Sequence, residues 1–290
     1  MSLVSSSERV VIQPEYGLAN RLRAISSAYS LSRKWGSELI VVWLPDEHCE
    51  AKLTDLFEPD FQVIQEEKAL WEIEAANKFR YYDWTLGMRR RDELMAFLGH
   101  GPRFIASSKF FMTRWRHHAR WARSFLRNLR PTPEVTKLIG EVEIDYPVSL
   151  HVRQVGGPGF DHLQYENASN WGAEAHASIG RARASSRPEK FVEFVSELEK
   201  SAEFGTQFPV YVAADNETAK VALTEHFGLR ARFIPTELES RSVRQVQGAF
   251  AELLLLSKAE VFVGSPYSSF SELVPLLSEK EQRVTIVAID

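Results

Sequence analysis

The sequence has little cysteine and no long apolar run. Cys49 is the one cysteine among 290 residues, which excludes an intramolecular disulfide and fits a reducing compartment. No apolar stretch approaches the roughly 20 residues that a membrane-spanning helix needs. The N-terminal "MSLVSSSERVV" lacks the apolar core of a signal peptide. We therefore expect a soluble, cytoplasmic protein without a transmembrane segment.

Neither sign of charge predominates. The sequence has 35 Lys and Arg against 39 Asp and Glu, so its formal net charge is −4. This balance gives the chain no general attraction for nucleic acid, and any anion-binding site must be local. With 44% hydrophobic residues and no internal repeat, the chain is long enough for two ordinary globular cores.

Short apolar runs rich in Val and Ile alternate with helical patterns. This order is typical of buried parallel sheets with crossover helices. In the first half we expect strands at 9–13 and 38–44, with a helix at 20–35 between them. In the second half we expect strands at 147–153, 208–214, 231–235, 260–264 and 283–289, and helices at 188–201, 216–227, 245–258 and 268–279.

The pattern predicts an α/β chain with two Rossmann-like domains that face a cleft. The first domain is expected at 1–140, with a helix-rich insert at about 66–140, and the second at 145–290. The prolines of "RPTPEV" make a plausible hinge between them. In open α/β sheets ligands bind beyond the carboxyl ends of the strands, so the residues that follow each strand are the candidates for a site.

The first expected strand is followed by "EYGLANRLR", which begins a helix. Free N–H groups and the positive dipole end of a helix suit a phosphate or sugar hydroxyls. Gly17 allows a close approach there. Asn20 could instead only cap the helix, and Arg21 and Arg23 could simply be solvated.

Arginine and histidine follow the first strand of the second half. His151 and Arg153 are two residues apart, so their side chains point to the same side. A planar, permanently charged guanidinium suits a diphosphate, although an ion pair across a domain interface is the alternative. Residues 156–186 contain glycines and show no clear periodicity, so we expect a long binding loop or lid.

Polar residues also follow the next strands. Asp215 and Asn216 stand at a helix start, where they could cap the helix, contact a nucleoside or do both. Ser265, Ser268 and Ser269 precede another helix and are similar to a phosphate nest without a lysine. Several such strand ends in register indicate one binding site.

Taken together, these stretches resemble the fucosyltransferase-like glycosyltransferase superfamily, which includes nodulation, core α-1,6 and protein O-fucosyltransferases. "YGLANRLR" is similar to its Gly-x-x-Asn-Gln/Arg-Leu element, and "LHVRQ" to its His-x-Arg-Arg-x-Asp motif. "VYVAADN" is similar to its second C-terminal motif and "ELLLLSKAEVFVGSPYSSFSEL" to its third. The motifs occur in order across most of the chain, leaving 45–140 largely uncovered.

The resemblance implies a GT-B-like fold in which the second domain binds a nucleotide sugar, expected to be GDP-linked, and the first lies on the acceptor side. It implies inverting transfer to a glycan hydroxyl without a metal or cofactor, the nucleotide sugar being a substrate. Arg153 would hold the β-phosphate; His151, Asp215 and Asn216 would contact the nucleoside. Ser265, Ser268 or Ser269 would contact the phosphates. Gly17, Asn20 and Arg21 would contact the donor from the first domain.

The sequence supports a metal-independent reaction and departs from the family in one place. It contains no Asp-x-Asp pair, the usual metal holder of the other large glycosyltransferase fold. The second arginine of the family motif is Gln154, and its aspartate position falls on glycine. The general base must then come from elsewhere. Asp161 is our first candidate, and the same loop also offers His162, Glu166 and Glu174.

These observations leave the donor sugar and one basic stretch open. L-fucose from GDP-fucose is the sugar that the resemblance implies, and rhamnose or xylose donors are alternatives. A non-catalytic nucleotide- or glycan-binding protein of the same fold is a further alternative, which donor turnover would distinguish.

"TRWRHHARWARSFLRNLR", residues 113–130, has six arginines and no acid. It could touch an anionic acceptor or a membrane, or be a solvated helix face whose aromatic residues pack inward.

Overall fold

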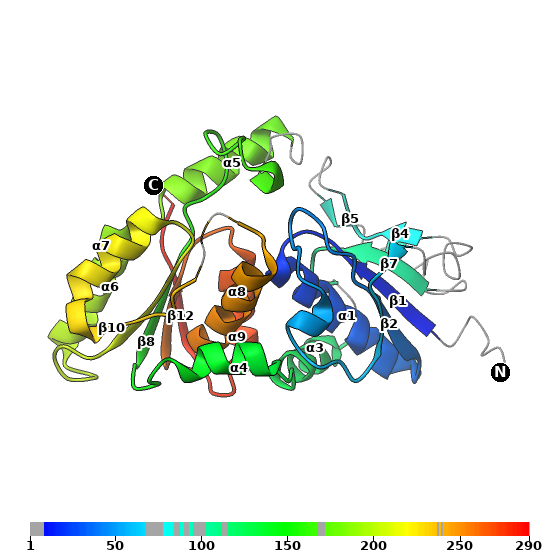
Figure 1. The fold of residues 1–290 in the computed structure, drawn as a ribbon, viewed down its shortest axis with the longest axis horizontal. Coiled ribbons are helices and arrows are strands. Elements are labelled where there is room, and N and C mark those ends of the chain that lie inside the picture. The colour runs from blue at the N-terminus through cyan, green and yellow to red at the C-terminus, as the bar shows by residue number, and fades with distance from the viewer. Residues whose placement is uncertain are drawn as a thin grey trace. The chain divides into compact units, whose positions relative to one another are not determined.

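Both halves of the chain contain a parallel sheet with helices, as the sequence predicts (Figure 1). The computed structural model describes residues 9–67, 78–83, 88–89, 93–94, 103–111, 115–166, 172–236, 238 and 240–289. The chain divides into two compact units, Met1–Thr132 and Pro133–Asp290. The α/β class is therefore confirmed, while the cleft between the units stays a prediction.

The first unit is built on the βαβ element that the sequence predicts. It consists of β1 (Arg9–Pro14), α1 (Leu18–Trp35) and β2 (Glu38–Val42). The parallel sheet has the order β3-β2-β1-β7-β4. The other elements are the short helix η2 (Leu53–Asp55), β3 (Gln62–Ile64), β4 (Lys78–Arg80), the antiparallel pair β5 (Tyr82–Asp83) and β6 (Met88–Arg89), β7 (Arg103–Ser107) and α3 (His118–Arg127).

The expected helix-rich insert at 66–140 differs from the structure in its first part. Strand β7 lies beside β1 in the middle of the sheet, and β4 extends the sheet beyond it. Each of these strands has too short an apolar run to be told from a helical segment by periodicity. Helices occupy only the later part of the described insert. Residues 68–77, 84–87, 90–92, 95–102 and 112–114 lie outside the described residues.

Helix α1 is buried along most of its length. Its buried face includes Leu22, Ile25 and Leu31, which pack under the sheet. The helix ends at Gly36, whose φ of 61° lies in the left-handed region that glycine adopts without strain. The chain can then turn directly into β2.

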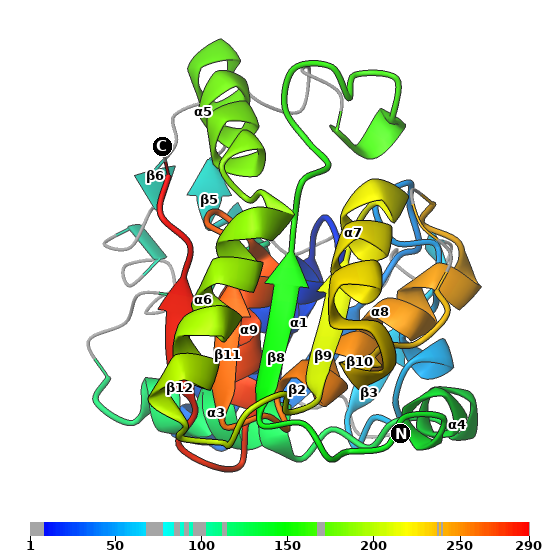
Figure 2. The ribbon, with the colours of Figure 1, turned by 90° about the vertical axis from the view of Figure 1, so that its left-hand side faces the viewer.

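The second unit contains a parallel sheet with the order β10-β9-β8-β11-β12. Helices α6 and α7 cover one face of this sheet, and α8 and α9 cover the other (Figure 2). Its elements are α4 (Pro133–Gly140), β8 (Val148–Val152), η4 (Gln164–Glu166), α5 (Ala173–Ala184), α6 (Pro188–Ser201), β9 (Val210–Ala214), α7 (Glu217–Phe227), η6 (Gly228–Arg230), β10 (Ala231–Arg232), α8 (Val243–Leu256), β11 (Val261–Gly264), α9 (Ser269–Leu277) and β12 (Arg283–Ile286).

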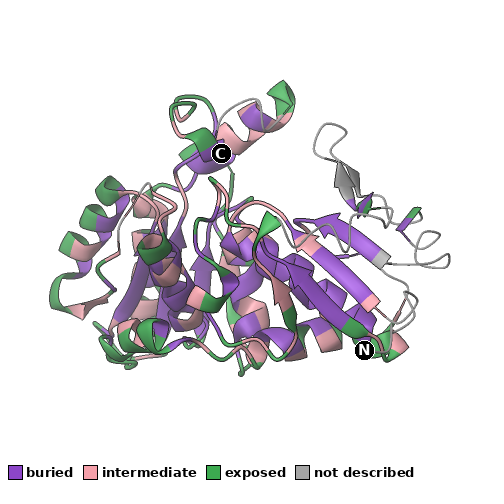
Figure 3. Cartoon of the chain, turned by 45° about the vertical axis from the view of Figure 1, so that its right-hand side comes forward, coloured by how far each residue is buried: buried purple, intermediate pink, exposed green. Residues whose placement is uncertain are grey.

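One hydrophobic core of the second unit lies between the sheet and helices α6 and α7. Alternate residues of β8, β9 and β11 face this side, because side chains alternate along a strand. Leu150 and Val212 are fully buried there against Phe191 of α6 and Leu223 of α7. Figure 3 shows the central strands of the sheet buried along their length. The strand ends are therefore held rigidly, which positions the loops that follow them.

The prediction of a loop at 156–186 is wrong in its second half, where the structure has helix α5. The helix is built from small and polar residues, and only His176, Ala182 and Arg183 are buried. A helix without a stripe of large apolar side chains gives no 3.6-residue pattern in the sequence. The irregular part runs from 153 to 163 before η4, and residues 167–171 lie outside the described residues.

Candidate functional site

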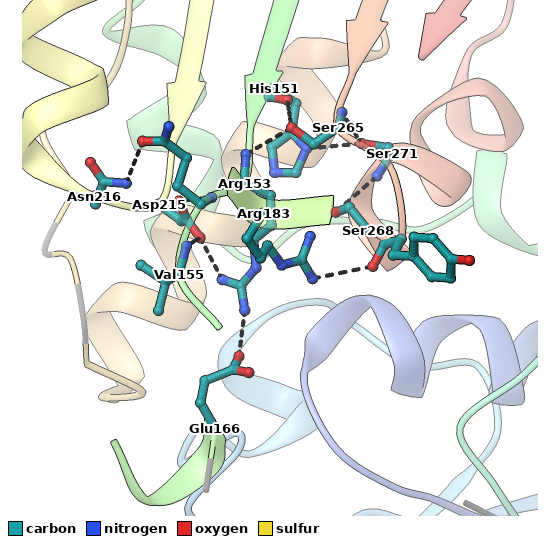
Figure 4. Close-up of polar contacts among 12 residues, drawn as sticks. His151, Arg153, Val155, Glu166, Arg183, Asp215, Asn216, Ser265, Ser268 and Ser271 are labelled. Carbon is teal, nitrogen blue, oxygen red and sulfur yellow. Dashed lines mark hydrogen bonds and ion pairs between the residues drawn. The ribbon is translucent and has the colours of Figure 1, made fainter. Parts of the chain in front are cut away.

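The carboxyl ends of three neighbouring strands form the candidate site in the second unit. Because β8 lies between β9 and β11, the residues that follow these strands come together (Figure 4). Arg153 follows β8, Asp215 follows β9 and Ser265 follows β11. The sequence prediction that these strand ends form one site is therefore consistent with the topology.

Ser265 joins two of the strand ends. Its Oγ accepts a hydrogen bond from the Arg153 backbone N–H at 2.9 Å and donates to the His151 carbonyl at 3.0 Å. Its own N–H donates to Ser271 Oγ at 3.0 Å. Ser268 caps α9 by accepting from the Ser271 N–H at 3.5 Å, and Ser269 is the first residue of that helix. These serines thus fix the backbone of β8 against the start of α9.

His151 is buried and neutral. Burial, together with the charges of Arg153 and Arg183, lowers the pKa of its imidazole to about 3. Its Nδ1 lies 3.1 Å from Ser271 Oγ, and its ring stacks on Phe270 at 5.2 Å between centroids. Because Ser271 Oγ already accepts from the Ser265 N–H, its hydroxyl can donate to Nδ1. The imidazole then carries its hydrogen on Nε2, where it is a donor.

Asp215 holds the chain that leaves β8. Its Oδ1 accepts from the Gln154 N–H at 2.8 Å and its Oδ2 from the Val155 N–H at 2.9 Å. The same Oδ2 lies 2.9 Å from Arg153 Nη1. Next to it, Asn216 caps α7 through the Ala219 N–H at 2.8 Å, and its amide donates to Gln154 Oε1 at 3.0 Å. The helix-capping role expected for Asn216 is confirmed.

Arg153 lies between two carboxylates. Its Nη2 is 2.6 Å from Glu166 Oε1, while Nη1 contacts Asp215. Burial alone would disfavour its charge, but the carboxylates of Asp215 and Glu166 outweigh burial and raise the pKa of Arg153. The side chain keeps 17% of its surface exposed. The guanidinium is therefore permanently charged, held in one orientation and still accessible.

Two further arginines lie close to this ion pair. Arg183 donates to the carbonyls of Pro266 at 3.3 Å and Tyr267 at 3.2 Å. Burial, and then the charge of Arg153, lower its pKa to about 9, so it is still charged at neutral pH. Arg241 lies over the ring of Tyr165, 4.0 Å from the centroid. Burial and the charge of Arg153 lower its pKa as well.

The cluster has an excess of positive charge. Arg153, Arg183 and Arg241 carry three charges, whereas Asp215 and Glu166 carry two. The Nε atoms of Arg183 and Arg241 are buried and have no hydrogen-bond partner within the described part of the chain. A buried donor without a partner costs free energy. An anion bound here would therefore be stabilised by the excess positive charge and would accept hydrogen bonds from the unpaired donors. We call these five residues the arginine cluster.

Sequence reasoning missed two of the five residues of the arginine cluster. It named Arg153 and Asp215 as site residues and Glu166 as a possible base, but not Arg183 or Arg241. Glu166 instead forms an ion pair with Arg153. Asp161, the first candidate base, is half-exposed and lies 3.7 Å from His176 Nε2 of α5. This contact joins it to α5 and does not involve the arginine cluster.

The first-unit candidates lie at the start of α1. Gly17, and not Asn20, is the N-cap of the helix, so the alternative that Asn20 only caps the helix is wrong. The Asn20 side-chain oxygen accepts from Arg23 Nη2. Arg21 and Arg23 are 1% and 2% exposed, so they are not solvated. Burying a guanidinium requires hydrogen-bond partners, and each arginine has them within the unit.

Arg21 holds together the chain segments that follow β1 and β2. It donates to the Tyr16 carbonyl at 2.6 Å and the Leu44 carbonyl at 2.7 Å, and its Nη2 lies 2.7 Å from Asp46 Oδ2. Its guanidinium also lies over the Trp43 ring. These contacts give Arg21 a positioning role within the first unit.

A polar cavity of about 190 Å³ lies at the carboxyl ends of β1 and β2. Burial raises the pKa of Glu15 in spite of the nearby positive charges of Arg80 and Lys78. Tyr16 has a φ of 66°, unusual for a residue with a side chain, and its ring meets that of His48 at 5.0 Å. The cavity is lined by Gln13, Pro14, Glu15, Tyr16, Leu44, Asp46 and His48.

Within the described residues, no group of three His, Cys, Asp or Glu side chains could hold a metal ion. Among the helices that the structure describes, none has the length and apolar character to cross a membrane.

Known fucosyltransferases have a similar structure. No protein-family model matches the sequence, and no curated protein matches it significantly. A structure of NodZ α-1,6-fucosyltransferase soaked with GDP-fucose has a TM-score of 0.59 and 17% identity, with 93% of each chain covered. NodZ from Bradyrhizobium gives a TM-score of 0.59 at 16% identity, again with 93% of each chain covered. POFUT1 in complex with GDP-fucose gives a TM-score of 0.55 at 14% identity, covering 99% of this chain and 100% of that one. The chain therefore has the fold of these fucosyltransferases.

Proposed function

We propose that this chain is a glycosyltransferase that transfers L-fucose from GDP-fucose to a glycan hydroxyl. The arginine cluster carries the proposal, because it combines excess positive charge with unpaired donors at the carboxyl ends of parallel strands. Such strand ends are where open α/β sheets bind nucleotides. The donor class is supported by solved structures of the same fold, several of which were determined with GDP or GDP-fucose.

The arginine cluster would bind the donor diphosphate. Arg153 would hold the β-phosphate, since Asp215 and Glu166 orient its guanidinium. Arg183 and Arg241 would add further charge and their unpaired Nε–H donors. As the bond from the sugar C1 to the phosphate oxygen breaks, negative charge grows on that oxygen. Preorganised cations at this position lower the barrier without having to reorient.

The remaining contacts in the second unit would place the nucleoside and phosphates. His151 would offer its Nε2–H to the nucleoside. Ser265, Ser268 and Ser269 lie around the start of α9, where backbone N–H groups suit a phosphate. Asp215 and Asn216 would act by shaping the loop after β8, because their side chains already bind backbone and Gln154.

Inverting transfer needs a base for the acceptor hydroxyl, and two carboxylates outside the arginine cluster are candidates. Asp161 is half-exposed and lies near His176. Glu15 lines the polar cavity of the first unit, and burial raises the pKa of its carboxyl. A base with a raised pKa accepts a proton more readily. We therefore favour Glu15, with Gly17 and Asn20 nearby and the first unit on the acceptor side.

The reaction would not need a metal ion. In many transferases a divalent cation neutralises the leaving diphosphate. Here three guanidiniums would supply that charge. Turnover of GDP-fucose should therefore be the same with and without excess EDTA, and a loss that Mg²⁺ or Mn²⁺ restores would contradict this part of the proposal.

Donor binding and turnover test the proposal. At 100 times its Kd, GDP should raise the unfolding free energy by about 2.7 kcal/mol, and UDP should raise it less. GDP-fucose alone should be hydrolysed slowly, and the fucose anomer first released, read by NMR, should be opposite to that of the donor. For substitutions in the arginine cluster, Arg232→Ala is the matched control, because Arg232 pairs with Asp145 away from the cluster. Binding of GDP without any turnover would indicate a non-catalytic protein.

A further inference from the structure

The described part of the basic stretch, residues 115–130, forms part of a largely exposed patch in the first unit, in which Arg127 is half-buried. Helix α3 packs against α1, and its buried side includes Ala122, Phe125 and Leu126. Arg120, Arg123 and Arg127 follow one another at spacings of three and four residues, so they share one helix face. The sequence-based alternative that the aromatic residues of this helix pack inward holds for Phe125 but not for Trp121, which is half-buried.

Further cations extend this face. Arg116 precedes α3 and Arg130 follows it, and both are exposed. Arg33 and Lys34 are exposed at the end of α1, and Arg33 lies over the Trp121 ring at 5.0 Å. We define the basic patch as Arg33, Lys34, Arg116, Arg120, Arg123, Arg127 and Arg130.

The cations of the basic patch are not neutralised by the described part of the chain. None of them forms an ion pair with a described residue, although the exposed Glu58 lies at one end, where its N–H donates to the Arg130 carbonyl. The protein as a whole has a net charge of −4, so the patch is a local reversal of sign. Uncompensated like charges on one surface repel each other, and an anionic partner would remove that cost.

Tryptophan is concentrated in the same place. Of the tryptophans that the structure describes, Trp43 is fully buried, whereas Trp35, Trp115 and Trp121 are half-buried beside the patch cations. Trp121 lies under both Arg33 and Arg120, and Trp35 lies near Lys34 Nζ at 5.1 Å. Indole rings partly open to solvent and surrounded by arginines suit the headgroup region of a lipid bilayer. A soluble polyanion would need the charges but not the indoles.

We propose that the basic patch binds the surface of a membrane containing anionic lipids. The apolar side of α3 is packed in the unit, so the helix cannot insert and would adhere by charge and by its indole rings. Guanidiniums would bind lipid phosphates, and binding would fall steeply as salt screens the charges. This attachment is separate from the arginine cluster and does not depend on the proposed transferase activity.

Co-sedimentation with vesicles tests the proposal. The intact protein should sediment with vesicles of equimolar phosphatidylserine and phosphatidylcholine, but not with phosphatidylcholine alone, and 0.5 M NaCl should release it, a concentration at which the Debye length falls to about 4 Å. Arg120→Gln with Arg123→Gln should weaken binding roughly tenfold or more. Lys258→Gln with Lys280→Gln, a change of two exposed cations in the second unit, should have little effect.

Three results would overturn the proposal. The first is an intact protein that ignores anionic vesicles at low salt. The second is equal weakening by the patch variant and the control variant. The third is binding to heparin, a soluble polyanion, without binding to vesicles, which would point to a polyanionic partner. Unchanged thermal unfolding of the patch variant would show that both substitutions leave the fold intact.

Discussion

Arg153 and Asp215 leave the ends of adjacent strands and meet at 2.9 Å between Nη1 and Oδ2. Asp215 also binds the backbone N–H groups of Gln154 and Val155, so one carboxylate fixes both the loop and the guanidinium. The ion pair does more than neutralise charge. It sets the direction in which Arg153 presents its remaining surface, which is what a preorganised phosphate-binding group requires.

Replacing Arg153 should affect both catalysis and stability. In Arg153→Ala, turnover of GDP-fucose should fall roughly 10²-fold or more, the scale of losing one preorganised donor. Arg153→Lys should recover little, since an ammonium cannot contact two oxygens in one plane. Because Asp215 and Glu166 lose their partner, the unfolding free energy should also fall by about 3–5 kcal/mol. Turnover within a few-fold of wild type in a folded Arg153→Ala protein would contradict the assigned role.

The strand ends of the site could be predicted from the sequence, but two of its three arginines could not. Arg153 and Asp215 directly follow strands with a clear apolar pattern, so their meeting depends only on strand order. Arg183 lies in the last turn of α5, whose small residues give no periodic signal. Arg241 lies in an irregular segment before α8. Both join the cluster through tertiary packing, and no local sequence pattern predicts their positions in it.

The first unit shows the same limit of prediction from the sequence. The β1-α1-β2 element was predictable because apolar runs rich in Val and Ile flank an amphipathic helix. Strand β7 was not, although it pairs with β1 along five residues, because its apolar run is short. The burial of Arg21 was missed for a similar reason. A guanidinium is normally exposed, and the carbonyls of Tyr16 and Leu44 together with the carboxylate of Asp46 make its burial favourable.

Gly157 should be essential for the packing of the loop after β8. Its φ is 86°, and an added Cβ would lie 2.4 Å from the Gly180 Cα of α5. In Gly157→Ala the backbone of α5 must move, so amides 173–184 should exchange hydrogen faster and Tm should fall. Gly159→Ala is the matched control, with a φ of 99° and free space around the new Cβ. It should cost only the backbone strain, about 1–2 kcal/mol. Equal effects of the two variants would show that the contact is unimportant.

For the lid expected at 156–186, the contacts of the segment lead to a narrower prediction about which part responds to the donor. The contacts of Gly157 with Gly180, of Glu166 with Arg153 and of Arg183 with Tyr267 hold parts of this segment to the second unit. Donor phosphates would compete with Glu166 for Arg153. Addition of GDP should therefore change hydrogen exchange around η4 more than around the second half of α5. An equal change in both, or none, would count against a donor-coupled segment.

Glu252 should make the protein less stable as pH rises. Its carboxyl is buried, which raises its pKa from 4.5 to about 7, although Lys220 and the Thr236 hydroxyl favour the charged form and Asp215 opposes it. The folded state therefore holds a proton that the unfolded state loses above pH 4.5. This contribution to stability is complete below pH 4.5, declines between pH 4.5 and 7, and is lost above 7.

Glu252→Gln isolates this effect. The variant cannot ionise, so at pH 8 it should unfold at a higher free energy than wild type, by on the order of 3 kcal/mol. At pH 4.5 the difference should be small. Comparing the two proteins removes the opposite contribution of His151, whose lowered pKa of about 3 destabilises the fold as pH falls below 6.5. A difference that does not change with pH would contradict a raised pKa for Glu252.

Glu15 should be needed for the chemical step but not for donor binding. If it is the base, Glu15→Gln should reduce hydrolysis of GDP-fucose by about 10²- to 10⁴-fold, the usual contribution of general-base catalysis. Water replaces the acceptor hydroxyl in this assay, so no acceptor has to be known. The Kd for GDP should change little, because the arginine cluster lies in the other unit.

Asp161→Asn is the matched comparison, since it neutralises the other candidate without changing its size. We expect it to leave hydrolysis within a few-fold of wild type. The pH profile adds a second readout. A base works only when deprotonated, so wild-type turnover should rise with pH through the raised pKa of Glu15, above its usual value of 4.5. Glu15→Gln should lose this rise. If Asp161→Asn abolishes hydrolysis while Glu15→Gln keeps both rate and pH profile, the base is Asp161, and the polar cavity of the first unit has another role.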